Sequence, residues 1–207
     1  MTKNKKAVVI IVCSLAILIG LGVTYILNST QILRAVGLSK PAPVFVFNES
    51  KAPGWWAAEN YNSRDSTKPD KYEGSEPIEK LPVASMNVFK GEKGQYKTAC
   101  FILSSYYDYK TDTAQLSKNK EDEVRASTSM RKIGDSNVSI NMFGEPKSFT
   151  MKNYELVGPD AENAMKGMSY GWIEAGDGYV GVNSVCPTAS ELDETSAVIG
   201  ALSLVKQ

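Results

Sequence analysis

The chain has 207 residues, with 23 lysines and arginines, 23 aspartates and glutamates, and no histidine. Without histidine, Ser-His-Asp catalysis, Cys-His catalysis and imidazole ligation of a metal are all excluded. Residues 1–40 hold five basic residues and no acidic ones, which leaves 18 basic and 23 acidic residues in 41–207, a net charge of −5 there. An acidic domain lacks the positive surface that nucleic acids require, so we expect no nucleic-acid partner.

The first predicted element is a membrane-spanning helix at residues 7–27. This segment is uncharged, and Lys3, Lys5 and Lys6 precede it. A bilayer core about 30 Å thick needs roughly 20 apolar residues, and only a helix satisfies its own backbone hydrogen bonds in lipid. Lysines beside such anchors stay in the cytoplasm. We therefore predict a cytoplasmic tail at 1–6, a single pass through the lipid bilayer of the plasma membrane, and a C-terminal domain outside.

Three other kinds of N-terminal segment fit less well. A cleaved signal peptide has an apolar core of about 7–15 residues and a small-x-small cleavage site, whereas this core is longer and ends in Tyr-Ile-Leu-Asn at 25–28. A lipoprotein has a small residue before its modified cysteine, but Val12 precedes Cys13. A type IV pilin has an early glutamate that this segment lacks. We expect an uncleaved signal-anchor.

Residues 28–82 are predicted to contain the end of this helix and a loop-rich linker. Gly37 favours a helix end, and six prolines and glycines interrupt the polar stretch from 48 to 82. Trp55 and Trp56 lie in this stretch. One interpretation is that they pin the segment to the domain or lie at the membrane interface; the other is that they form a stacking platform for a sugar or a peptide.

Residues 83–207 are predicted to form the domain outside the cytoplasm. Apolar and aromatic residues occupy both parities of 95–109, which is typical of a central strand covered on both faces. The charged segment 113–126 is predicted to be a solvated helix. Residues 137–143 alternate between apolar and polar side chains, and 148–157 is predicted to return as the next strand.

The last part of the domain is predicted to be a hairpin followed by a helix. Asp-Gly at 177–178 between the strand patterns 167–174 and 179–186 is a strong hairpin signal. Thr188 and Glu191 have the spacing of a capping box, which predicts that a helix begins there and runs to the C-terminus. Its apolar stripe consists of Leu192, Ile199, Leu202 and Val205.

The three cysteines differ in their predicted surroundings. Cys13 lies in the membrane segment, where it serves as a small apolar residue. Cys100 and Cys186 both lie outside the cytoplasm, where disulfides persist, so we predict a structural Cys100–Cys186 disulfide. A redox-active or nucleophilic thiol would need a neighbouring base and often a Cys-x-x-Cys spacing, and neither is found.

This order of elements predicts an α+β fold, in which a single N-terminal transmembrane helix precedes an antiparallel sheet packed with helices, the C-terminal helix docked on the sheet. The strand at 178–182 leading to a capped terminal helix at 197–203 resembles the end of Mog1/PsbP-type domains, and the similarity covers about 95–205. That family consists mostly of binding and accessory domains, so the resemblance implies a non-enzymatic role.

The remaining motifs favour binding over catalysis. Two Ser-x-x-Lys sequences lack the further motifs of serine acyltransferases, and no acidic loop has the pattern of a calcium site. We therefore expect no cofactor, no metal and no enzymatic activity, and we predict an accessory domain of the cell envelope that binds an envelope protein or a wall glycan. The alternatives are a carbohydrate- or peptidoglycan-binding module and, less favoured, a small carboxylate-dependent hydrolase. The candidate binding residues are Trp55, Trp56, Tyr106, Tyr107 and Tyr109.

Overall fold

The computed structural model describes residues 42–58, 60–61, 80–94, 100–127, 129–157 and 165–206. The chain divides into two compact units, Met1–Pro41 and Ala42–Gln207, and every described residue belongs to the second. The predicted tail at 1–6, the predicted membrane helix at 7–27 and the predicted helix end beyond it therefore lie outside the described residues. Within the described ranges, no helix is both long and apolar enough to cross a bilayer.

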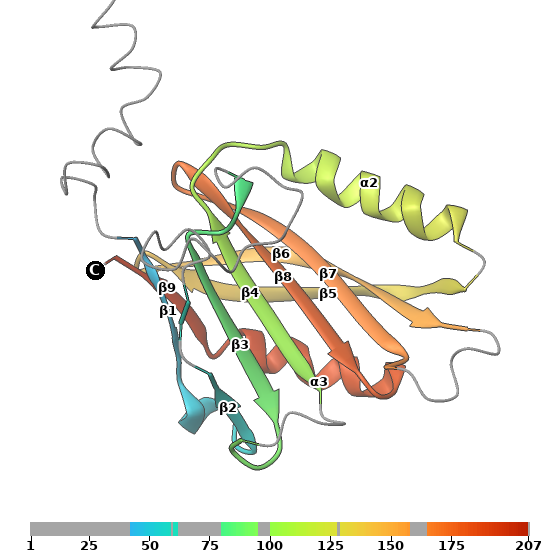
Figure 1. Cartoon of the computed structure of the whole chain (residues 1–207), viewed down its shortest axis with the longest axis horizontal. Helices are drawn as coiled ribbons and strands as arrows, with labels where there is room; N and C mark the ends of the chain where they lie inside the picture. The colour runs from blue at the N-terminus through green and yellow to red at the C-terminus, as the bar shows by residue number, and fades with distance from the viewer. Residues whose placement is uncertain are drawn as a thin grey trace, which may run out of the picture. The chain divides into compact units, whose positions relative to one another are not determined.

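The described strands form one nine-stranded sheet (Figure 1). In chain order the strands are β1 (Val44–Phe47), β2 (Trp55–Ala57), β3 (Ala84–Lys90), β4 (Phe101–Tyr107), β5 (Met130–Met142), β6 (Glu145–Leu156), β7 (Gly167–Ala175), β8 (Gly178–Cys186) and β9 (Leu202–Val205). Their order across the sheet is β1-β9-β5-β6-β7-β8-β4-β3-β2. All neighbours are antiparallel except β5 and β9, which are parallel. The described helices are α2 (Thr113–Ala126), α3 (Leu192–Ile199) and the 3-10 turns η1 (Glu49–Lys51) and η5 (Ala189–Glu191).

The predicted α+β class, an antiparallel sheet packed with helices and ending in a docked C-terminal helix, is wrong. The sheet is mixed, and the last helix ends at Ile199, after which the chain forms β9 between β1 and β5. Ile199, Leu202 and Val205 fit a helical spacing. However, Leu202 and Leu204 are both fully buried, and the residue after each of them is half-buried. That alternation is the two-residue period of a strand, and over four residues the two periods cannot be told apart.

Both edges of the sheet are formed by residues of the predicted linker. β1 pairs with β9, and β2 pairs with β3. The sheet curves so far that β1 lies beside β3. The Asn60 side chain closes the gap, because the backbone N–H of Phe45 donates to its Oδ1 at 2.9 Å while its Nδ2 donates to the Phe45 carbonyl oxygen at 2.6 Å. Residues 44–57 are thus part of the sheet.

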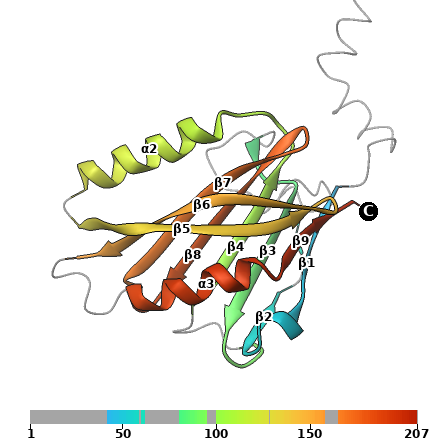
Figure 2. The ribbon, with the colours of Figure 1, turned by 180° about the vertical axis from the view of Figure 1, so that it is seen from behind.

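The hydrophobic core lies on the inner face of the curved sheet, and α3 packs there against β5, β7 and β8 (Figure 2). The approach to α3 is tight. A Cβ atom at Gly167 of β7 would lie 2.6 Å from the carbonyl oxygen of Thr188, so only glycine fits there. The predicted capping box is present, with the Thr188 N–H donating to Glu191 Oε2 at 3.1 Å, and it opens η5, which leads directly into α3.

The predicted Cys100–Cys186 disulfide is confirmed. β4 and β8 are antiparallel neighbours with Phe101 opposite Val185, which places the two cysteines opposite each other at the next position. Their Cα atoms are 4.1 Å apart, and both side chains are completely buried in the core. The bond therefore joins two central strands of the sheet and closes a sequence separation of 86 residues.

Candidate functional site

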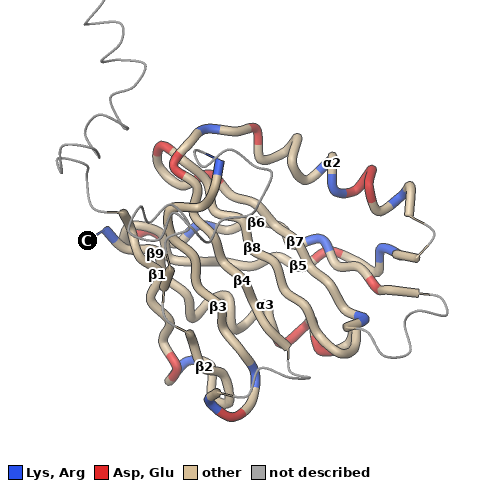
Figure 3. The backbone as a smooth tube through the Cα atoms, in the orientation of Figure 1, with Lys and Arg blue, Asp and Glu red and all other residues tan. Residues whose placement is uncertain are grey.

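Helix α2 lies on the outer face of the sheet, against β5 and β7. Its bounds match the predicted helix at 113–126, and Asp112 caps it by accepting a hydrogen bond from the Gln115 N–H at 3.0 Å. Val124 is buried beneath the helix, and Lys120 Nζ lies 4.7 Å from the centre of the Tyr170 ring. Charged residues gather along α2, whereas β3, β4 and β8 carry few (Figure 3). The helix therefore places charged side chains over a sheet face that is otherwise mainly apolar.

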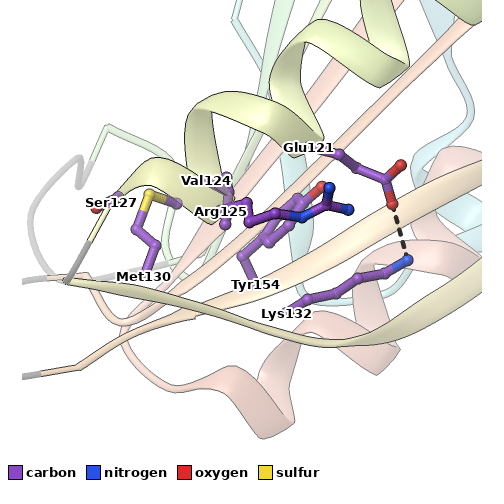
Figure 4. A pocket seen from close by; sticks show the side chains of 7 residues that line it. All are labelled: Glu121, Val124, Arg125, Ser127, Met130, Lys132 and Tyr154. Carbon is purple, nitrogen blue, oxygen red and sulfur yellow. Dashed lines mark hydrogen bonds and ion pairs between the residues drawn. The ribbon is translucent and has the colours of Figure 1, made fainter.

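A pocket of about 300 Å³ lies between α2 and the strands β5 and β6. Both layers contribute to its wall, and Figure 4 shows the side chains converging from the helix and from the sheet below it. The residues that line it are Glu121, Val124, Arg125, Ser127, Met130, Lys132 and Tyr154. Two of these are apolar, one is acidic and two are basic, so the lining has a net charge of +1.

The Tyr154 side chain is the most unusual member of this pocket. It is only 1% exposed, and no described residue forms a hydrogen bond with its hydroxyl. A buried polar atom without a partner costs about 1–3 kcal/mol. Burial, and then the negative charges of Glu121 and Asp135, raise the pKa of Tyr154, so the hydroxyl keeps its proton. It is a neutral donor that points towards α2 (Figure 4).

Four alternating charges form a network beside the pocket. Lys132 Nζ lies 2.9 Å from Glu121 Oε1 and 2.9 Å from Asp135 Oδ1. Lys152 Nζ contacts the same two carboxylates, at 3.4 Å and 3.3 Å. The bonds to Asp135 and Glu121 raise the pKa of Lys132, and the bond from Lys132 lowers the pKa of Glu121. All four groups are therefore charged at neutral pH and compensate one another.

Arg125 is compensated much less. Its side chain is 81% exposed, and its ion pair with Asp122 has an N–O distance of 3.7 Å. An exposed pair at this distance contributes little, typically about 0.2–1 kcal/mol or less. The guanidinium is thus the pocket's cation that can turn towards a ligand at small cost.

Three of the five predicted binding residues are buried. Trp55 belongs to the hydrophobic core, and Trp56 stacks on Phe89 with ring centres 5.0 Å apart. Tyr106 lies on the inner face, with its ring edge-to-face with Phe143. Adjacent positions of a strand point to opposite faces, so the two tryptophans pack on opposite sides of β2. These contacts agree with the interpretation that the tryptophans pin the segment to the domain, and a binding role for all three residues stays a prediction.

The other two predicted residues, Tyr107 and Tyr109, lie together on the outer face. Tyr179 joins them: its ring stacks on Tyr107 at 4.6 Å, and its hydroxyl shares a hydrogen bond of 3.0 Å with that of Tyr109. Burial and the bond to Tyr109 raise the pKa of Tyr179. Tyr170 and Trp172 continue the set along β7, with nearly parallel rings. We call these five residues the aromatic row.

Sequence reasoning missed Trp172 and Tyr154, for different reasons. Trp172 lies opposite Gly181 in the β7–β8 hairpin, and its indole rests over this glycine, 3.3 Å from where a Cβ atom would be. The predicted hairpin centre implies this pairing, so the signal was present in the sequence. Tyr154 alternates with charged residues, and only the position of α2 makes it buried.

Neither the described residues nor the comparisons with other proteins identify a cofactor site or a relative. No group of three or more acidic or cysteine side chains in the described ranges is arranged to hold a metal ion. No model of a known protein family matches the chain, and no curated protein matches it either.

Proposed function

We propose that this chain is a membrane-anchored domain outside the cytoplasm that binds a partner in the cell envelope and catalyses no reaction. Its main support is the buried Cys100–Cys186 disulfide in the core of the sheet, because structural disulfides are made and kept in oxidising compartments. The uncharged segment 7–27 behind three lysines supplies the anchor and sets the orientation.

Labelling of cysteines in intact cells tests the location and the orientation together. In a full-length Cys13→Ser background, Ile133→Cys places a thiol on a side chain that is 43% exposed. We expect a membrane-impermeant maleimide to label it in intact cells. The matched variant Lys3→Cys should react only after the membrane is disrupted. Labelling of Lys3→Cys alone in intact cells, or of neither variant, would refute the proposed topology.

A second candidate, binding of a wall glycan, is favoured by the aromatic row. Trp172 lies flat over Gly181 and is half-buried, so part of its indole faces solvent. Aromatic rings with one free face are suited to stacking on sugar rings, since they combine apolar area with polar edges. Tyr107 and Tyr109 of the predicted site lie next to it on the same face.

Retention on insoluble wall material tests this candidate. We expect the full-length protein in detergent to be retained, and Trp172→Ala or Tyr109→Ala to lower the retained fraction several-fold. Ile133→Ala, which shortens an exposed apolar side chain outside the aromatic row, should have no effect. If the wild-type protein is not retained, or if all three variants are retained equally, the glycan proposal fails.

A further inference from the structure

We infer that the pocket under α2 binds a small organic carboxylate, with the Tyr154 hydroxyl and the Arg125 guanidinium holding its carboxylate group and an aliphatic tail lying against Val124 and Met130. This inference goes beyond the proposed function and does not depend on it: it requires neither the membrane anchor nor the aromatic row. Three features of the pocket carry it.

The first feature is the hydroxyl of Tyr154. Buried polar groups in folded proteins are nearly always hydrogen-bonded, yet this one has no partner among the described residues. It lines the pocket and is almost completely buried. Because the hydroxyl is protonated, it is ready to donate to an acceptor oxygen of a ligand. A ligand that offers only donors would leave it without the donor role that its proton allows.

The second feature is the distribution of charge. Lys132 and Lys152 are neutralised by Glu121 and Asp135, so the network has no net charge. Arg125 adds a positive charge that has only a long contact with Asp122. A planar guanidinium matches the two oxygens of a carboxylate. A cationic ligand would meet the ammonium group of Lys132 and the guanidinium at once and is disfavoured.

The third feature is the apolar part of the wall. Val124 is buried and Met130 half-buried, and both face the same cavity as Tyr154. At about 300 Å³ the pocket is at the small end of ligand sites. Inorganic phosphate would satisfy the donors but would leave this wall without contact. A carboxylate with a short aliphatic chain satisfies both.

Calorimetric titration of the full-length protein in detergent, in a buffer without carboxylate or phosphate, tests the inference. The probes are butyrate, n-butylammonium and inorganic phosphate. We expect butyrate to bind with a stoichiometry of one, butylammonium to show no binding and phosphate to bind more weakly. Absence of butyrate binding, or binding of either other probe as tight as that of butyrate, would overturn the inference.

Two pairs of variants assign the contacts. Tyr154→Phe should weaken butyrate binding about 10-fold or more, since a hydrogen bond to a charged group is lost, whereas Tyr170→Phe removes a hydroxyl that does not line the pocket and should change it less than about twofold. Arg125→Gln should also weaken butyrate binding, and Lys118→Gln, an equal charge change elsewhere on α2, should not. Equal affinity of Tyr154→Phe and the wild type would refute the assignment.

The melting temperature of each variant without ligand separates binding from folding. Removing a buried hydroxyl that has no partner does not destabilise a protein, so ligand-free Tyr154→Phe should unfold at the same or a higher temperature than the wild type. Butyrate should raise the melting temperature of the wild type and leave that of Tyr154→Phe unchanged. A lower melting temperature of ligand-free Tyr154→Phe would show that the hydroxyl has a structural partner, which also overturns the inference.

Discussion

Replacing Cys100 and Cys186 together with alanine is expected to lower the free energy of unfolding by roughly 4–5 kcal/mol. The bond closes a sequence separation of 86 residues, and without it the unfolded chain regains the freedom that this loop removes. Both side chains are completely buried beside the core, so no solvent contact compensates for the loss. Single domains have a stability of about 5–15 kcal/mol, and most of it could disappear.

Urea denaturation of the full-length protein in detergent, followed by tryptophan fluorescence, measures this effect. Cys13→Ala is the matched control, because it removes the third cysteine of the chain without touching the bond, and it should leave the urea midpoint unchanged. A double variant that unfolds at the wild-type urea concentration would show that the bond contributes nothing to stability.

Changing Leu202 to aspartate is expected to unfold the domain. Leu202 is completely buried, and it pairs with Phe47 of β1. A carboxylate at this position would lose its hydration without gaining a partner, which costs several kcal/mol or forces the group to be protonated. β9 also joins β1 to β5, so the damage would separate two parts of the sheet.

Circular dichroism during heating, together with limited proteolysis, measures the outcome. Ser203→Asp is the control: it introduces the same charge one position later, on the opposite face of β9, where the side chain is half-buried. We expect Leu202→Asp to lose its cooperative transition and to be digested rapidly, and Ser203→Asp to melt within a few degrees of the wild type. A wild-type transition for Leu202→Asp would mean that β9 is not part of the core.

Local signals were sufficient for several elements. Helix α2 has the predicted bounds, because its polar residues and its cap act within a few positions of each other. The β7–β8 hairpin turns at Gly176 and Asp177, as the Asp-Gly signal indicates. The parity of Cys186 within β8 predicted that it faces the core, which is where Cys100 lies.

Long-range pairing was not accessible in the same way. β1 and β9 are each only four residues long, and each is stabilised by the other and, for β9, by β5. In isolation the first looks like a linker and the second like the end of a helix. The parallel pairing of β5 and β9 brings together residues about 60 positions apart, and no local pattern encodes such a contact.

The sequence by itself determined the short-range features of this protein: the charged helix, the hairpin, the capping box and the pair of cysteines, together with a predicted anchor at 7–27 that lies outside the described residues. Only the tertiary structure decided which polar groups lose their water. Tyr154 is one tyrosine among ten in the sequence, and it becomes a buried donor without a described partner because α2, from a distant part of the chain, lies across β5 and β6. Burial depends on which segments meet in space, and the candidate site therefore exists only in the folded chain.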